Sequence, residues 1–122
     1  MNHPTVLRTT RLLLVIAVSG IVFFGPAPSA EANAVVAIVE RDPDDASTWA
    51  FEPADVTIPA GASVIWEWKG QDKHSATSDN GAFDSGEKQG VGQRWEFKFA
   101  SPGEYPYSCT PHPFMYGTVH VT

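Results

Sequence analysis

The sequence predicts an all-β fold, an antiparallel β-sandwich or barrel with Greek-key connections. Short apolar segments with a two-residue period recur roughly every ten residues, and turn clusters rich in Gly, Pro, Asp and Ser separate them. Downstream of the apolar run near the N-terminus, no window of about 11 residues or more shows the 3.6-residue repeat of an amphipathic helix. Both observations favour strands joined by turns, as in Greek-key sandwiches.

Alternation of apolar and polar residues marks the strands in order. The clearest segment, 94–99, alternates three aromatic residues with charged ones, so we expect a half-buried strand with an apolar inner face. The turn-rich stretch 78–93 is long for a loop, which favours a short irregular strand around Phe83. Tyr105 is a candidate for the tyrosine corner of Greek-key folds. The expected strands are VVAIVE (35–40), VTIP (56–59), SVIWEWKG (63–70), RWEFKF (94–99), GEYPYSC (103–109) and GTVHV (117–121).

Residues 1–34 are expected to be a secretory signal peptide. Arg8 and Arg11 precede a 13-residue apolar run, 12–24, and the following segment ends in small residues. The run is shorter than the roughly 18 residues needed to span a membrane, so an uncleaved membrane anchor is the weaker alternative. Cleavage sites that fit equally well follow Ala30, Ala32 and Ala34.

With Val35 as the first mature residue, one domain remains, 35–122, which we expect in the periplasm or outside the cell. Its 88 residues can build a single core, so we expect one module and a monomer. The domain carries a net charge of −7, which argues against nucleic acid or an anionic membrane as a partner. The acidic segment 41–47 is expected to be a solvated turn.

The segment CTPHPFM (109–115) contains the most informative residues. Cys109 is the only cysteine, although small exported domains usually rely on paired cysteines. His112 and Met115 follow it at three-residue spacing, and Pro111 and Pro113 restrict the backbone between them. Taken alone, Cys109 would be interpreted as a small buried hydrophobic residue, and Met115 as a side chain that fills a gap in the core. Together with the imidazole between two strands, they predict a metal site.

His74 is the candidate for the remaining ligand. It follows the strand that contains Trp66, and a Greek-key sandwich can bring that strand end beside a closing loop. The competitor, His120, falls on the Thr118 face of the last strand and is expected at the surface. Two imidazoles, one thiolate and a weak methionine sulfur form the trigonal blue-copper arrangement. Such a site suits both Cu(II) and Cu(I), so it favours transfer of single electrons.

These residues carry a family resemblance. GEYPYSCTPHPFMYGTVHV (103–121) resembles the C-terminal part of the cupredoxins, and its Cys-x-x-His-x-x-Met spacing is most similar to the amicyanin group. HSATSDNGAFDSG (74–86) resembles the first-histidine segment of plastocyanin-like and amicyanin-like proteins. The resemblance implies a cupredoxin-like Greek-key β-sandwich of about eight strands. It also implies one type 1 copper, bound by His74, Cys109, His112 and Met115.

The resemblance also implies where partners dock. His112 would reach the surface inside an apolar patch formed partly by Pro111, Pro113 and Phe114, and a redox donor and acceptor would bind there. Many relatives have Asn after the first histidine, whereas this chain has Ser75. A hydroxyl makes fewer hydrogen bonds than an amide, so we expect the ligand loop to be held differently.

Three classes of function compete. A small exported carrier of single electrons fits all the residues, and two prolines in the ligand loop favour the rigidity that it needs. The alternative is an extracytoplasmic copper buffer or chaperone. We do not expect an enzyme, because a thiol hydrolase needs a cleft and an orienting third group, and a copper oxidase needs further histidines. Zinc is disfavoured because structural zinc sites use four Cys or His ligands.

Overall fold

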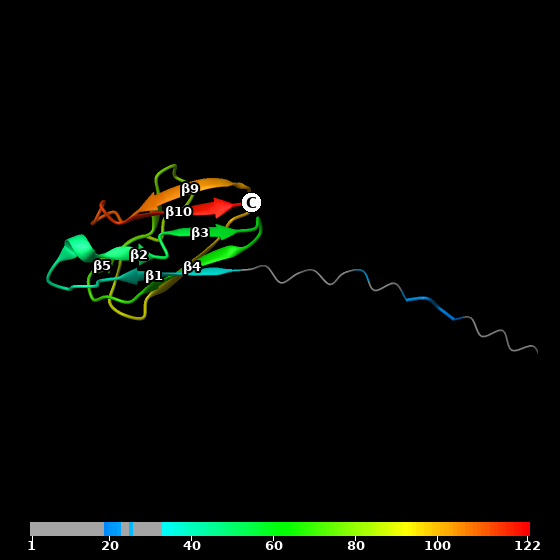
Figure 1. The fold of residues 1–122 in the computed structure, drawn as a ribbon, viewed down its shortest axis with the longest axis horizontal. Helices are drawn as coiled ribbons and strands as arrows, with labels where there is room; N and C mark the ends of the chain where they lie inside the picture. Colours follow the sequence, from blue (N-terminus) through cyan, green and yellow to red (C-terminus); the bar gives the residue numbers. More distant parts are fainter. Residues whose placement is uncertain (1–18, 23–24, 26–32) are drawn as a thin grey trace, which may run out of the picture.

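The computed structural model describes residues 19–22, 25 and 33–122. The arginines and most of the apolar run of the expected signal peptide lie outside the described residues, as do Ala30 and Ala32. Within the described part, no helix is long and apolar enough to cross a membrane. Residues 34–121 fold into the predicted all-β sandwich, and Figure 1 shows its strands running roughly parallel to one long axis.

Two four-stranded sheets form the sandwich. Eight strands in two sheets confirm the predicted architecture, and a further two-stranded pair lies beside them. The first sheet has the order β2-β1-β4-β8, with β1 at Ala34–Val39, β2 at Ala50–Glu52, β4 at Ser63–Trp68 and β8 at Arg94–Lys98. The second has the order β3-β10-β9-β6, with β3 at Asp55–Ile58, β6 at Thr77–Ser78, β9 at Gly103–Ser108 and β10 at Tyr116–Val121. The extra pair joins β5, Lys73–His74, to β7, Lys88–Gln89.

The pairing is mixed, which corrects the expectation of purely antiparallel sheets. Strand β1 runs parallel to β4, and β10 runs parallel to β3, while the other pairs are antiparallel. The reason is that the chain changes sheet between β2 and β3 and again between β3 and β4. Strands that become neighbours after such crossings need not be joined by a hairpin.

The predicted inner faces form the core. Val64, Trp66 and Trp68 are all fully buried, and Phe99 is also buried at the end of the β8 segment. The expected strand around Phe83 is reduced to an isolated bridge between Thr77 and Asp84. Phe83 instead inserts its ring into the aromatic core, 5.3 Å from the Trp66 ring and 5.9 Å from the Tyr107 ring.

A tyrosine corner marks one end of β9, and the candidate ligand loop follows its other end. The Tyr105 hydroxyl donates a hydrogen bond of 2.8 Å to the carbonyl of Ser101, which confirms a tyrosine corner at the start of β9. At the other end of β9, the loop 109–115 leads into β10. A 3-10 helix at Ala46–Thr48 follows an acidic turn that is exposed, as predicted, and Figure 1 shows this turn at the same end of the sandwich as the loop.

The first strand extends beyond the expected domain start. Ala34 already pairs with Val64 in β1, and the Asn33 side chain accepts a 2.9 Å hydrogen bond from the backbone N–H of Ser63. We therefore predict that a chain beginning at Asn33 is more stable than one beginning at Val35 by about 1 kcal/mol. Urea denaturation of the two chains measures the difference, with Asn33→Ala in the longer chain as control. Equal free energies of unfolding would show that the two residues contribute nothing.

Candidate metal centre

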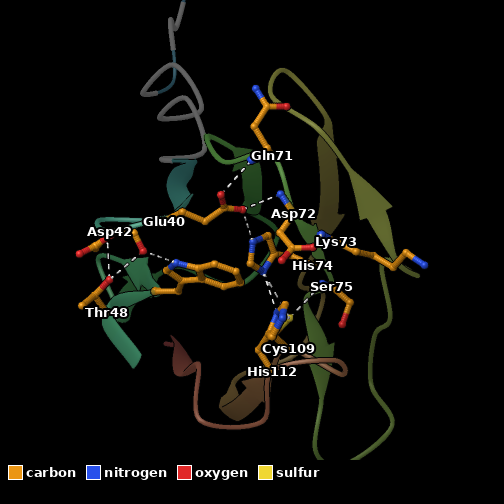
Figure 2. A network of polar contacts seen from close by, with 11 residues as sticks. Glu40, Asp42, Thr48, Gln71, Asp72, Lys73, His74, Ser75, Cys109 and His112 are labelled. Atoms are coloured by element: carbon orange, nitrogen blue, oxygen red, sulfur yellow. Dashed lines mark hydrogen bonds and ion pairs between the residues drawn. The ribbon is translucent and has the colours of Figure 1, made fainter. Parts of the chain in front are cut away.

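Three of the predicted ligands converge on one point. The Cys109 sulfur lies 3.7 Å from His74 Nδ1 and 3.6 Å from His112 Nδ1, and the two Nδ1 atoms lie 3.3 Å apart (Figure 2). Three donors arranged trigonally around a metal at about 2.1 Å would be about 3.6 Å from one another. The sequence places His74 35 residues before Cys109, and the fold brings them together because β5 lies beside the ligand loop.

The predicted fourth ligand, Met115, lies in the same closed loop. Its backbone N–H donates to the carbonyl of His112 at 2.9 Å, and its carbonyl accepts from the N–H of Cys109 at 3.1 Å. The His112 N–H in turn donates to the Cys109 carbonyl at 3.1 Å. The Met115 side chain is buried, as an inward-pointing thioether must be. Coordination by this sulfur stays a prediction.

The environment of Cys109 suits a metal thiolate better than a reactive thiol. The side chain is fully buried, and the backbone N–H of Ser75 donates to its sulfur at 3.4 Å. Burial raises the pKa of the Cys109 thiol, and hydrogen bonds from Ser75 and His112 offset only part of this effect. The thiolate therefore needs a bound cation beside it, which argues against an independent nucleophile.

Hydroxyl groups hold the two ligand segments together. Ser75 Oγ accepts a 2.9 Å hydrogen bond from the N–H of Thr110, the residue after Cys109. The same hydroxyl contacts the hydroxyls of Thr110 at 3.0 Å and Thr77 at 2.9 Å, and Thr77 donates to Asp84 at 3.0 Å. The loop is thus tied to the His74 segment through a chain of hydroxyls.

Sequence reasoning missed the carboxylate behind His74. Glu40 Oε1 lies 2.9 Å from His74 Nε2, and its side chain is only 6% exposed. Burial raises the pKa of Glu40, but hydrogen bonds from His74, Asp72 and Gln71 outweigh this and hold it below its ordinary value. The sequence gives no spacing signal for this contact, since Glu40 appears only as a polar residue at the end of an apolar strand.

Trp49 is the second residue that sequence reasoning missed. Trp49 is buried, and its ring packs edge-on against both imidazoles. The ring centroids lie 5.5 Å from His74 and 5.0 Å from His112. Its indole N–H donates to the carbonyl of Asp42 at 2.8 Å, which holds the indole against the site. Trp49 therefore shields the histidines from water.

His112 is the outermost member of the cluster. It is half-buried, whereas His74 and Cys109 are fully buried. The predicted neighbours Pro111, Pro113 and Phe114 are exposed, and the Phe114 ring centroid lies 5.9 Å from that of His112. Burial, followed by the nearby His74, lowers the pKa of His112.

His120 stays outside the metal cluster, as predicted. It lies on β10 with its side chain 37% exposed, and it contacts the carboxylates of Glu104 and Asp55 at the surface. The described residues contain one cluster of three or more His, Cys, Asp or Glu side chains that could hold a metal ion, formed by His74, Cys109 and His112.

Comparison with known proteins agrees with this site. A family model described as copper binding proteins of the plastocyanin/azurin family matches residues 37–122, and the chain belongs to this family. Copper is therefore its cofactor, and the sulfur and nitrogen donors of the cluster fit that metal.

Individual relatives come from different parts of the family. The chain is 40% identical over 80 residues to amicyanin-alpha of Methylorubrum extorquens, covering 58% of this chain and 63% of that one, slightly less than two thirds. It is 32% identical over 121 residues to chloroplastic plastocyanin of Tetradesmus obliquus, covering 91% and 81%. A purple cupredoxin from Nitrosopumilus maritimus superposes with a TM-score of 0.64 at 29% identity, covering 73% of this chain and 99% of that one.

Proposed function

We propose that this protein is a carrier of single electrons with one type 1 copper. His74, Cys109 and His112 would hold the metal, and Met115 would be a weak fourth ligand. The observation that supports this most directly is the approach of one sulfur and two imidazole nitrogens to within 3.3–3.7 Å of one another. That donor set suits both oxidation states of copper.

The residues around the ligands would keep them fixed while the charge of the metal changes. Bound copper supplies the Cu(II)/Cu(I) couple that accepts and releases one electron. The closed ligand loop, its tie to Ser75 and the ring of Trp49 all limit movement of the donors. A site that does not rearrange has a small reorganisation energy, so electron exchange is fast.

Electron exchange would occur at the His112 end of the site. We propose that a redox donor and acceptor dock there, against exposed Pro111, Pro113 and Phe114. His74 and Cys109 are fully buried, so neither can contact a partner directly. The exposed side chains are apolar and allow close approach, and no nucleic acid or small substrate is needed.

A copper buffer or chaperone is the second candidate, but the burial of the site favours the carrier. Metal transfer between proteins requires ligands that can open and exchange, whereas Cys109 and His74 are inaccessible.

We also propose that the protein is a monomer and that it is exported after removal of the N-terminal segment. The charged start, the short apolar run and the small residues that follow it support export.

Spectroscopy and redox cycling test the carrier function. The mature domain loaded with Cu(II) should show an intense blue thiolate-to-copper band and a narrow EPR hyperfine splitting. The band should disappear on reduction and return on oxidation over many cycles without loss of copper. A pale spectrum typical of nitrogen and oxygen ligands would contradict the type 1 site. Loss of copper within a few cycles would favour copper handling.

The reduction potential should rise as the pH falls. Protonated His112 cannot bind copper, and Cu(I) tolerates the loss of one ligand better than Cu(II), so reduction takes up a proton in acid. Burial disfavours the charged imidazolium and lowers the pKa of His112, so it opposes protonation and should move the rise toward acid pH. The slope should approach about 59 mV per pH unit for one electron and one proton. Voltammetry from pH 8 to pH 4 measures it, and a flat potential would contradict the prediction.

A further inference from the structure

We propose that Glu40 is a positioning residue of the copper site, which holds His74 as the Nε2-protonated tautomer and lowers the reduction potential. The inference rests on the proposed type 1 site. It concerns a residue 34 positions away from His74 that belongs to neither the ligand loop nor the first-histidine segment.

Both carboxylate oxygens of Glu40 accept hydrogen bonds. Oε1 accepts hydrogen bonds from His74 Nε2 at 2.9 Å and from the backbone N–H of Asp72 at 2.7 Å, and Oε2 accepts from the N–H of Gln71 at 3.0 Å. Figure 2 shows the side chain reaching from the end of β1 into the turn before β5. With 6% of the side chain exposed, these contacts are shielded from water, so they are stronger than surface contacts.

The turn before β5 is shaped to receive this carboxylate. A Cβ atom at Gly70 would lie 2.1 Å from Glu40 Cδ, so no larger residue fits there unless the carboxylate moves. The N–H of Lys69 donates to the carbonyl of Ile38 at 2.9 Å, which anchors the turn to β1. The strand that carries Glu40 and the turn that precedes His74 are therefore one assembly.

The geometry determines the tautomer of His74. Nδ1 points at Cys109 Sγ and His112 Nδ1, so it must keep a lone pair to bind a metal. The proton then resides on Nε2, which faces the carboxylate of Glu40. A carboxylate that accepts a hydrogen bond from Nε2–H makes Nδ1 a stronger ligand for the metal, and its negative charge favours Cu(II) over Cu(I). Both effects lower the reduction potential.

Glu40→Gln tests the inference at constant pH. The amide keeps the size of the side chain and one acceptor oxygen, but it removes the charge. We expect a blue band close to that of the unaltered protein and at least a tenfold shift of the Cu(II)/Cu(I) equilibrium toward Cu(I), which is about 59 mV. Glu67→Gln is the matched control, since Glu67 lies on β4 and its carboxylate pairs with Lys69 and Arg94, away from the ligands. It should shift the equilibrium less than twofold.

The outcomes separate this inference from the proposed function. An unaltered protein without a blue band would overturn both. A blue Glu40→Gln variant whose potential equals that of Glu67→Gln would overturn only the role of Glu40. If Glu40→Gln does not fold, the nitrogen NMR spectrum of the unaltered Cu(I) protein provides the test, because it shows which imidazole nitrogen of His74 carries the proton. A proton on His74 Nε2, hydrogen-bonded to the carboxylate, supports the inference, and a proton on Nδ1 overturns it.

Discussion

Replacing Cys109 by serine should abolish the blue band of the copper-loaded protein, and replacing His74 by alanine should do the same. The band requires a thiolate sulfur bound to copper, and a serine oxygen is a poor substitute for it. His74 supplies one of three donors within 3.3–3.7 Å of one another, so its loss opens the trigonal site. Removing His74 also leaves the buried Glu40 carboxylate without its imidazole partner.

Visible and EPR spectra of the Cu(II)-loaded variants measure this effect. His120→Ala is the control, because this histidine lies at the surface of β10 beside Glu104 and Asp55, outside the cluster. It should leave the spectrum unchanged. A blue band that survives in Cys109→Ser would show that the thiol does not bind the metal. A band that is lost in His120→Ala would show that His120 is needed for the copper site, which contradicts its place outside the cluster.

Local sequence patterns predicted the parts of the fold that depend on local geometry. The alternation in β4 and β10 identified buried faces correctly, because a strand side chain points to one face or the other with a period of two. The spacing of Cys109, His112 and Met115 predicted a compact loop, because a segment of seven residues can bring the three side chains together. The structure places all three in one loop closed by backbone hydrogen bonds.

The missed features depend on contacts between distant segments. Glu40 reaches His74 only because β1 pairs with β4 in parallel, which places the end of β1 beside the turn before β5. Parallel pairing follows from the order of strands in the sheets, and a single sequence does not encode that order in any local pattern. Trp49 was missed because an aromatic residue that packs against a metal site has the same signature in sequence as one that packs in the core.

The two histidines occupy different surroundings. His74 is buried and faces a carboxylate, whereas His112 is half-buried and lies beside apolar, exposed side chains. In the functions proposed above, the first arrangement would stabilise the oxidised metal, and the second would permit contact with a partner. Trp49 packs edge-on against both rings and so covers one side of each. The hydroxyl chain around Ser75 then determines how firmly the two ligand segments stay together.

Ser75→Ala should loosen the copper site more than its small size suggests. The substitution removes the acceptor of the Thr110 N–H and the contacts to two hydroxyls, and Ser75 itself is fully buried. Loss of such partners costs about 1–3 kcal/mol in the free energy of unfolding. The Ser75 N–H still reaches the Cys109 sulfur, so the blue band should remain. Copper should nevertheless dissociate at least tenfold faster, because the ligand loop can now move away from His74.

Denaturation of the copper-free variant and the rate of copper transfer to a chelator measure the two effects. Ser108→Ala makes the same change on β9, where the hydroxyl donates only to Asp79 at 3.1 Å. It should alter the rate of copper loss less than twofold. If Ser75→Ala released copper no faster than Ser108→Ala, the rigidity of the loop would come from its two prolines and its own backbone hydrogen bonds. A larger rate for Ser75→Ala would instead show that this serine links the two ligand segments.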